Sequence, residues 1–485
     1  MLNSVTAEFA GQLQHILPAA AFPDLSDKYL IEPRGRYHGS AGLLVAPENT
    51  EQVSQIMQTA EQARVAVLPY GGGTGLVGGQ VLTSIAGGPP APLILSLERM
   101  RRIRGCYPEE NVLVVEAGAV LAEVQAAAAQ VNRLFPLSLA SEGTAQIGGL
   151  LATNAGGVNV LRYGMARDQV LGIEAVMADG QIFNGLKRLR KDNTGYDLRH
   201  LLIGSEGTLG IITAASLKLA PRPSAEGTAL LTVQSPRTAL ELLSRTKEIM
   251  GEGISAFEII SAQGLQFLAE TFPQMRQPWP EPPEWSVLLH VGLSGGMEPE
   301  QAFEMLFERA SDLILDGVIA QSQQQTKDLW ALRETIPLAN KAIGAICSSD
   351  ISLPLSEVPG FIESATRRIA KFGAVRANCF GHLGDGNLHY NIFPPAGGNV
   401  ADYVDIRDDL QQEVHCLAHE LGGSVSAEHG VGRLKVNDVA TFGDPVKLHL
   451  MRQIKDTLDP QGILNPGAVL PQKTWVGFRT LPRSH

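Results

Sequence analysis

The chain has 485 residues, of which 44% are hydrophobic and 18% are charged. Its length exceeds that of one ordinary domain and predicts two or three. The formal net charge of −11 argues against nucleic acid or an anionic membrane as the main partner.

The four cysteines form no CxxC pair, which argues against a disulfide framework or a thiolate metal site. The N-terminal stretch contains Glu8 and no basic segment, so it does not resemble a signal peptide. No apolar run reaches the roughly 18 residues of a membrane span. These features favour a reducing, cytoplasmic compartment.

The first half of the chain opens as an α/β pattern. A buried strand at 43–47 precedes a helix at 50–64, capped by Asn49 or Thr50, and a second strand at 65–70 runs into the glycine-rich loop 71–79. Further strands are expected at 92–97 and 111–119, with a helix near 120–132. A β-like run ends the polar segment 191–213.

A proline-rich break at 220–227 marks the first domain boundary. Beyond it, strands and amphipathic helices follow in an α+β pattern, including a helix kinked at Pro337 and another across 401–421. We expect an α+β protein in three parts: a cofactor domain at 1–220, a substrate domain with an antiparallel sheet at 221–425, and a segment at 426–485. The last part contains helix, completes the active site and returns to the first domain.

Gly73, Gly75 and Gly78 match the GxGxxG dinucleotide fingerprint, with Glu98 twenty residues further on. The fingerprint requires the third glycine to open a helix. Here the continuation "GQVLTSIAGGPPAP" is too rich in glycine and proline for that helix, so a nicotinamide site is not expected. Main-chain N–H groups approaching a phosphate explain the glycines better. A second glycine-rich stretch at 141–157 has the same character.

Long motifs in order resemble the FAD-binding domain of the vanillyl-alcohol-oxidase type: "PYGGGTGLVGG", "SLASEGTAQIGGLLATNAGG" and "DNTGYDLRHLLIGSEGTLGIIT". "LWALRE", "GHLGDGNLH", "SAEHGVGRLK" and "DPQGILNPGAVL" resemble the C-terminal domain of FAD-linked oxidases. The resemblance implies FAD held between two α+β subdomains. The loop 71–79 contains no histidine or cysteine that could attach the flavin, so the resemblance implies non-covalent FAD. The residues that it places around FAD are Gly71, Gly72, Gly73, Thr74, Gly75, Gly78, Ser141, Gly143, Thr144, Gly148, Gly149, Ala152, Asn154, Gly156, Gly157, Glu206, Ile212 and, near the flavin ring, Asn465.

The stretch "GHLGDGNLHY" contains two histidines and a strong hairpin signal, Asp385-Gly386. A two-residue turn centred there would place His382 directly opposite His389, with Cβ atoms roughly 4.5–5.5 Å apart. From this geometry alone, a metal pair and an ordinary cross-strand pair are equally supported. His415 and His419 share a helix face without the zincin glutamate, and we interpret them as an ordinary helical face.

"SAEHGVG" offers Glu428 as a third ligand, and a His, His, Glu set suits Zn²⁺, with Mn²⁺ or Co²⁺ as alternatives. The resemblance to metal-dependent flavin D-2-hydroxyacid dehydrogenases implies the same ligands, with His429 as the base.

Arg333 in "WALRE" is a candidate clamp for the substrate carboxylate; the alternative is a surface charge paired with Glu334 or Asp328. Asn391 shares the face of His389. The sequence looks most like the D-2-hydroxyglutarate dehydrogenase branch, but Pro337 and Ser348 stand where that branch has Thr and Lys. Lys341 or Lys435 could substitute, and D-lactate, glycolate or another D-2-hydroxy acid remains open as the substrate.

No haem motif, cluster cysteines or nicotinamide site is present, so electrons must leave to an external acceptor: an electron-transfer flavoprotein, a quinone or a cytochrome. The leading expectation is an FAD- and metal-dependent D-2-hydroxyacid dehydrogenase. The alternatives are a glycolate or D-lactate dehydrogenase subunit of a membrane-associated complex and a non-catalytic flavoprotein. A homodimer is left open.

Overall fold

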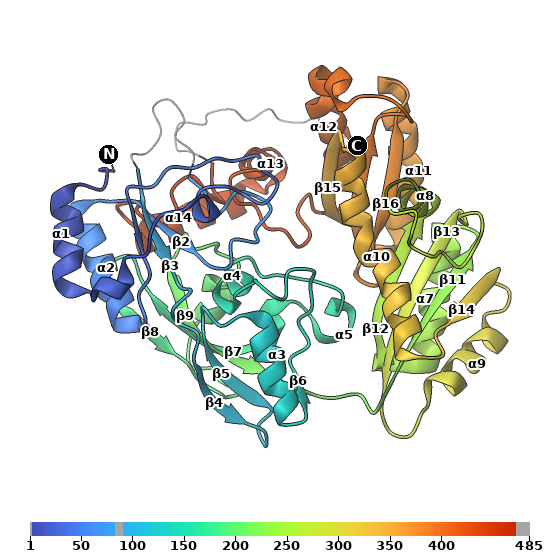
Figure 1. Cartoon of the computed structure of the whole chain (residues 1–485), viewed down its shortest axis with the longest axis horizontal. Helices are drawn as coiled ribbons and strands as arrows, with labels where there is room; N and C mark the ends of the chain where they lie inside the picture. Colours follow the sequence, from blue (N-terminus) through green and yellow to red (C-terminus); the bar gives the residue numbers. More distant parts are fainter. Residues whose placement is uncertain (1, 83–90, 472–485) are drawn as a thin grey trace. The chain divides into compact units, whose positions relative to one another are not determined.

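The computed structural model describes residues 2–82 and 91–471, and the chain folds into two compact units (Figure 1). The first unit comprises Met1–Gly157, Met165–Arg222 and Glu428–His485, and the second comprises Val158–Gly164 and Pro223–Ala427. Part of the segment that we expected to break the dinucleotide fingerprint, 83–90, lies outside the described residues. Within the described ranges, no helix has both the length and the apolar character needed to cross a bilayer.

The first unit begins with a three-stranded parallel sheet in the order β1-β3-β2, formed by Leu43–Val45, Leu93–Ser96 and Val67–Tyr70. The helices α1 (Ala7–Ile16) and α2 (Thr50–Ala63) lie side by side (Figure 1). Asn49 caps α2 by accepting a hydrogen bond from the N–H of Gln52, and the apolar stripe of α2 is buried, as predicted.

A five-stranded antiparallel sheet in the order β4-β5-β9-β7-β8 forms the second part of this unit. Its strands are Ile103–Tyr107, Val112–Glu116, Ile211–Lys218, Val170–Val176 and Ile182–Gly185. The helices α3 (Leu121–Gln130) and α4 (Ile147–Ala152) pack on it through a common apolar core. The short helix α6 (Leu198–Leu202) contributes Leu202 to the same core.

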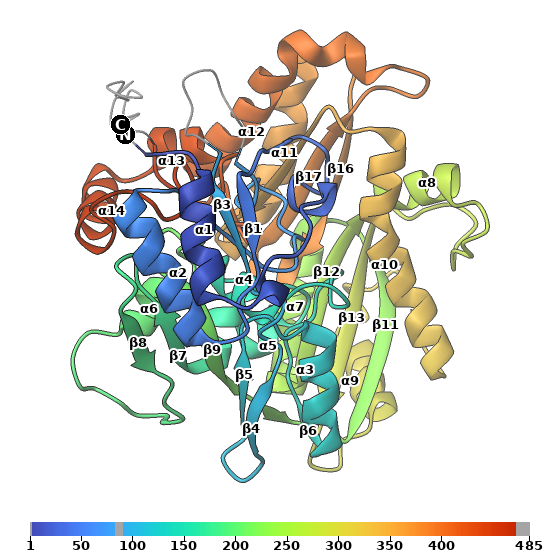
Figure 2. The same cartoon turned by 60° about the vertical axis from the view of Figure 1, so that its left-hand side comes forward.

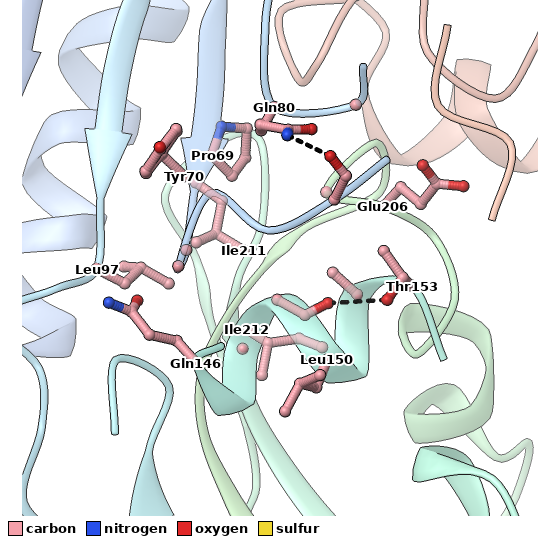
Figure 3. Close-up of a pocket in the computed structure, with 18 of the residues that line it drawn as sticks. Pro69, Tyr70, Gln80, Leu97, Gln146, Leu150, Thr153, Glu206, Ile211 and Ile212 are labelled. Atoms are coloured by element: carbon pink, nitrogen blue, oxygen red, sulfur yellow. Dashed lines mark hydrogen bonds between the residues drawn. The ribbon is translucent and has the colours of Figure 1, made fainter. Parts of the chain in front are cut away.

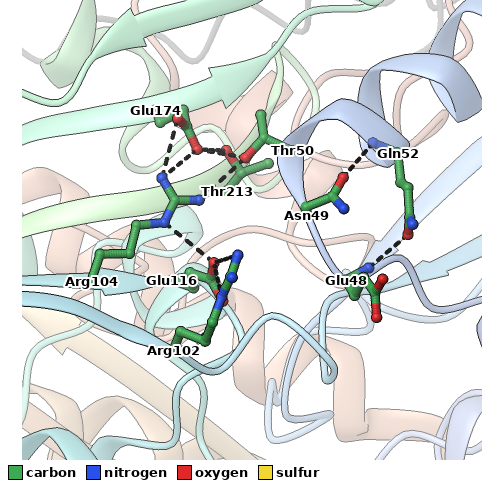
Figure 4. Close-up of polar contacts among 9 residues, drawn as sticks. All are labelled: Glu48, Asn49, Thr50, Gln52, Arg102, Arg104, Glu116, Glu174 and Thr213. Atoms are coloured by element: carbon green, nitrogen blue, oxygen red, sulfur yellow. Dashed lines mark hydrogen bonds and ion pairs between the residues drawn. The ribbon is translucent and has the colours of Figure 1, made fainter.

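A buried charged network ties α2 to this sheet (Figure 4). Glu116, which is fully buried, accepts hydrogen bonds from Arg102 and Arg104. Arg104 also donates to Glu174, which in turn accepts the hydroxyls of Thr50 and Thr213. The buried carboxylate is therefore compensated by two cations, as burial of a charge requires.

The C-terminal segment of the first unit contains α13 (Val436–Phe442) and α14 (Pro445–Leu458). After α14 the chain pairs with the first sheet in a parallel bridge between Leu464 and Val67, and the N–H of Asn465 donates to the carbonyl of Val67. This pairing fixes Asn465 at the edge of the first sheet.

The second unit is built on one seven-stranded sheet in the order β14-β11-β13-β12-β16-β17-β15. Its strands are Asp316–Ile319, Ala225–Val233, Trp285–Leu293, Ile254–Ser261, Arg376–His382, Asn387–Phe393 and Cys347–Ser352. Every pairing in it is antiparallel. This confirms the predicted α+β class with an antiparallel sheet in the second half.

Helices cover both faces of this sheet. One face packs against α7 (Pro236–Met250), α9 (Pro299–Arg309), α11 (Val358–Ile369) and α12 (Arg407–Glu420). The other face packs against α8 (Ala262–Thr271) and α10 (Gln323–Ile343), which are visible beside it in Figure 2. The helical run of α10 continues through Pro337, and the expected helix 401–421 begins as a 3₁₀ stretch, Val400–Ile406, before α12.

Candidate active site

A pocket in the first unit lies between the two glycine-rich segments (Figure 3). Eleven of the residues predicted to surround a cofactor line it: Gly71, Gly72, Gly73, Thr74, Gly75, Gly148, Gly149, Ala152, Glu206, Ile212 and Asn465. Most of its wall comes from three segments: β2 with the loop that follows it, α4 with its flanking residues, and the segment 205–212 that leads into β9. The sequence elements singled out for their glycines therefore meet around one cavity.

The glycines of this pocket serve two purposes. A Cβ on Gly72 would lie 2.2 Å from the carbonyl oxygen of Thr144, so this glycine lets the two glycine-rich segments pack together. A Cβ on Gly149 would meet nothing within 4 Å, although Gly149 lines the pocket. The absence of a side chain at Gly149 thus keeps part of the cavity open.

Other predicted cofactor residues do not line the cavity: Gly78, Ser141, Gly143, Thr144, Asn154, Gly156 and Gly157. Asn154 instead accepts the N–H of Arg167 through its side chain, and the N–H of Gly157 donates to Glu428 at 3.0 Å. The assignment of these residues to the cofactor stays a prediction.

Gln146 and Gln80 are pocket residues that sequence reasoning missed (Figure 3). Gln80 donates its side-chain N–H to the carbonyl of Gly75 at 2.7 Å and thereby braces the first loop. The side-chain oxygen of Gln146 is buried and has no hydrogen-bond partner among the described residues. A buried acceptor of this kind normally finds a partner, which here fits a ligand donor. Only its place inside the second glycine-rich segment could have signalled Gln146.

Glu206 connects the pocket to the C-terminal segment of the same unit. Its carboxylate accepts the N–H groups of Val431 and Gly432 at 2.7 and 2.8 Å. Burial raises the pKa of this carboxyl, opposed by these two hydrogen bonds. Glu206 therefore holds the turn that carries Glu428 and His429, whose side chains are 19% and 22% exposed.

Arg433 is a second buried connection that the sequence did not reveal. It donates to the carbonyls of Gly78, Gly79 and Pro466 and to the side chain of Asn465. Burial lowers its pKa to about 10. Asn465 in turn donates to the carbonyls of Gly79 and Glu206. The arginine thus fixes the first glycine loop and Asn465 in one network.

A polar stripe crosses one face of the sheet in the second unit. The strand ladders place His389 opposite Phe380 on one side and Asp350 on the other, and Glu258 opposite His382. The predicted register of the hairpin is therefore wrong: His382 does not face His389. The turn is four residues long, from Leu383 to Gly386, rather than two, because a 3₁₀ turn precedes the left-handed Gly386. The two histidines are diagonal neighbours, with ring centroids 5.6 Å apart.

Glu258 is a buried acid at the centre of this stripe. One carboxylate oxygen pairs with His382 Nδ1 at 2.6 Å, and the other accepts Arg333 Nε–H at 2.7 Å. Burial alone would raise the pKa of this carboxyl, but the charges and hydrogen bonds of His382 and Arg333 lower it to about 2. The sequence did not indicate Glu258 as a site residue.

Arg333 is 6% exposed and lies over the ring of Phe380 at 4.7 Å. The alternative interpretation of Arg333 as a surface charge paired with Glu334 or Asp328 is therefore wrong, because its partner is the buried Glu258. Its Nε is the one guanidinium nitrogen that hydrogen-bonds to another described residue.

His389 also has a carboxylate neighbour. Asp350 Oδ1 lies 3.8 Å from His389 Nδ1 and accepts a hydrogen bond from Asn387. The carbonyl of Asp350 accepts the N–H of Ala427, the last residue of the second unit. The chain therefore leaves the second unit beside the residue that faces His389.

The remaining predicted substrate residues lie in different surroundings. Asn391 is 6% exposed and faces Ser348 and Asn378 across its two ladders, on the face of His389. Lys341 is exposed on α10, whereas Lys435 is buried in the first unit. Asn391 thus shares the polar stripe with the histidines, and Lys341 is not buried in it.

The described arrangement supports two kinds of chemistry. The first unit offers a glycine-walled cavity with a buried amide acceptor, suited to a phosphate-bearing cofactor. The second unit offers two imidazoles, carboxylates and one buried arginine, suited to a divalent cation and an anionic ligand.

Two known families match most of the chain. Residues 41–185 match the FAD binding domain family, and residues 222–469 match the family described as FAD linked oxidases, C-terminal domain. The mitochondrial D-2-hydroxyglutarate dehydrogenase of Rattus norvegicus is 38% identical over 90% of this chain and 79% of its own length. The corresponding protein of Arabidopsis thaliana is 36% identical over 90% of this chain and 76% of its own length.

The fold also matches solved structures. A crystal structure of p-cresol methylhydroxylase superposes with a TM-score of 0.71, covering 96% of this chain and 98% of its own, at 18% identity. At this level of identity the likeness concerns the fold alone.

Proposed function

The chain belongs to the FAD-linked oxidase family, and on that premise we propose that it oxidises a D-2-hydroxy acid resembling 2-hydroxyglutarate to the 2-oxo acid, using FAD and a divalent metal. The observation that carries the proposal is the polar stripe of the second unit. It joins the paired imidazoles of His382 and His389 to the buried guanidinium of Arg333.

FAD would occupy the pocket between the glycine-rich segments. The open space at Gly149 and the buried acceptor of Gln146 fit a ligand with donor groups and a close approach to the main chain. When bound, FAD supplies the hydride acceptor. The role of Arg433 and Glu206 is to hold the first loop and the 431–432 turn in position.

The metal ligands would be His382, His389 and Glu428. Pairing of His382 Nδ1 with Glu258 directs coordination to Nε2, the other ring nitrogen. Glu428 follows Ala427 directly, and Ala427 is hydrogen-bonded to the residue that faces His389. Zn²⁺ suits this donor set, with Mn²⁺ or Co²⁺ as alternatives. A bound cation would supply Lewis acidity at the substrate hydroxyl.

The protein's own groups would position the substrate and move its proton. The Nη fork of Arg333 would hold the carboxylate in two parallel hydrogen bonds. His429 would remove the hydroxyl proton, because an imidazole can accept a proton near neutral pH. Asn391 would contact the substrate from the same strand face as His389.

The second carboxylate of a 2-hydroxyglutarate-like substrate would need a partner of its own on this chain. Pro337 lies inside α10 and Ser348 faces Asn391, so neither position offers a cation. Of the two lysines that could substitute, Lys341 is exposed, and Lys435 is buried in the unit that also carries Glu428 and His429. The missing threonine and lysine favour D-lactate or glycolate as the second candidate substrate class, with the chain acting in a membrane-associated complex. The electron acceptor would be an electron-transfer flavoprotein, a quinone or a cytochrome.

A substrate panel with an artificial dye tests the proposal. Purified protein should contain FAD and about one divalent metal per chain, and it should reduce the dye with D-2-hydroxyglutarate. Reduction with D-lactate or glycolate alone would transfer the assignment to the second candidate. Absence of turnover with every D-2-hydroxy acid, or full turnover after metal removal by a chelator, would contradict the proposal.

A further inference from the structure

Glu258 occupies a position where an acid carries a large energetic cost. It lies on the central strand β12 and is 1% exposed, and the next ladder pair on its face, Ile260 and Phe380, belongs to an apolar core. An unpaired carboxylate there would be strongly destabilising. Glu258 avoids this cost because it accepts hydrogen bonds from two side chains.

The two donors come from different elements and serve different ends of the proposed site. His382 lies on β16 directly opposite Glu258 in the ladder, so the backbone register sets their contact. Arg333 reaches the other oxygen from α10, which is fixed on the sheet by Leu329, Leu332 and Ile336. One carboxylate therefore contacts both the proposed metal ligand and the proposed substrate clamp.

We infer that Glu258 is a positioning residue that holds the His382 imidazole for metal binding and the Arg333 guanidinium for the substrate carboxylate. The inference rests on the proposed function and extends it to a residue that touches neither ligand. Accepting Nδ1–H fixes the tautomer in which Nε2 is the donor to a metal. Accepting Nε–H orients the planar guanidinium, whose Nη groups can then meet a carboxylate side by side.

Glu258→Gln removes one of the two acceptor oxygens while it keeps the size of the side chain. The amide has the same size, but its single oxygen can accept only one of the two donors, and its NH₂ would face the other. Losing such an outer contact typically weakens metal binding by about 10- to 100-fold. We therefore expect a Zn²⁺ dissociation constant about 10- to 100-fold higher, together with a raised KM, in protein that retains FAD.

The experiment titrates metal-free, FAD-loaded protein with Zn²⁺ against a competing chromophoric chelator. Glu116→Gln is the matched control, because it also removes a buried carboxylate shared by two donor side chains but lies in the first unit. This control should lose thermal stability and keep the wild-type Zn²⁺ affinity. Arg333→Met should raise KM and leave Zn²⁺ affinity within about threefold of wild type, since the contact between Glu258 and His382 remains.

Glu258→Asp covers the case in which the glutamine variant does not fold. It keeps the charge but is one methylene too short to reach both donors, so Zn²⁺ affinity should again fall. Wild-type Zn²⁺ affinity in a folded Glu258 variant would overturn the inference, provided that His382→Ala and His389→Ala lose the metal. If those two histidine variants also keep wild-type affinity, the metal site of the proposed function itself is wrong.

Discussion

His382 and His389 lie diagonally across the ladder of β16 and β17, with ring centroids 5.6 Å apart. Gly381 separates His382 from Phe380, the residue that faces His389, and has a φ of +152°. A Cβ at Gly381 would lie 2.5 Å from the carbonyl oxygen of Asn387. The close approach of the two strands, and with it the spacing of the two rings, therefore depends on a glycine at this position.

Gly381→Ala should separate the two strands and weaken both stability and metal binding. The strained φ alone costs about 1–3 kcal/mol. The added Cβ would also clash with backbone atoms of the facing strand, which cannot move away as a flexible side chain could. Thermal unfolding and Zn²⁺ titration measure the two effects. Gly360→Ala is the control, because a Cβ there meets nothing within 4 Å. Equal unfolding temperatures for the two variants would contradict this view of the hairpin.

Gly149→Ala should lose FAD without losing the fold. Its Cβ enters the open pocket and meets no protein atom within 4 Å, and alanine is the better helix former within α4. Flavin absorbance after gel filtration should fall while the melting temperature of the FAD-free protein stays at or above that of wild type. Gly11→Ala on α1, where a Cβ also meets nothing within 4 Å, should keep FAD. Full flavin content in both variants would argue against this pocket as the cofactor site.

Arg433→Lys should weaken the first unit. Lysine has one ammonium group in place of the fork that serves three carbonyls and Asn465, so several buried acceptors lose their donor. Each unsatisfied buried group costs about 1–3 kcal/mol. The expected result is a lower melting temperature and faster release of FAD on dilution. Arg407→Lys on α12, in the second unit, is the control; identical FAD release in both would count against the network.

His290 should make the protein less stable in acid. Its Nδ1 shares a hydrogen bond with the Thr228 hydroxyl. Burial, together with the charge of Arg162, lowers the pKa of His290 from 6.5 to about 4. Between these values the unfolded chain binds a proton that the folded chain does not, so stability falls as pH drops from about 6.5 toward 4, by at most about 3 kcal/mol. His290→Gln should show a shallower fall of melting temperature across this range. Parallel curves for variant and wild type would contradict the assignment.

Local signals were enough to predict several features. The Asn49 cap and the apolar spacing of α2 are set within one segment. The glycine content of the two loops was enough to predict that they line a cofactor pocket. The turn at Asp385-Gly386 was correctly located, but its length was not. The same residues can close a two-residue turn or follow a 3₁₀ turn, and the position of Gly386 against the carbonyl of Leu353 favours the second.

The residues missed by sequence reasoning depend on partners far along the chain. Glu258 is the one charged residue of a strand that is otherwise uncharged and buried, and its donors are 75 and 124 residues away. Arg433 reads as an exposed charge, but it bonds to carbonyls about 350 residues earlier. Such side chains become recognisable only when the strands and loops that surround them are known.

Metal content per chain in His382→Ala and His389→Ala, measured together with flavin absorbance, tests the central claim most directly. Each variant should lose the metal and the turnover of D-2-hydroxy acids while FAD remains bound, and His449→Ala, an exposed histidine on α14, should match wild type in all three measurements. Retention of one metal per chain by both variants, or wild-type turnover in either, would contradict the account.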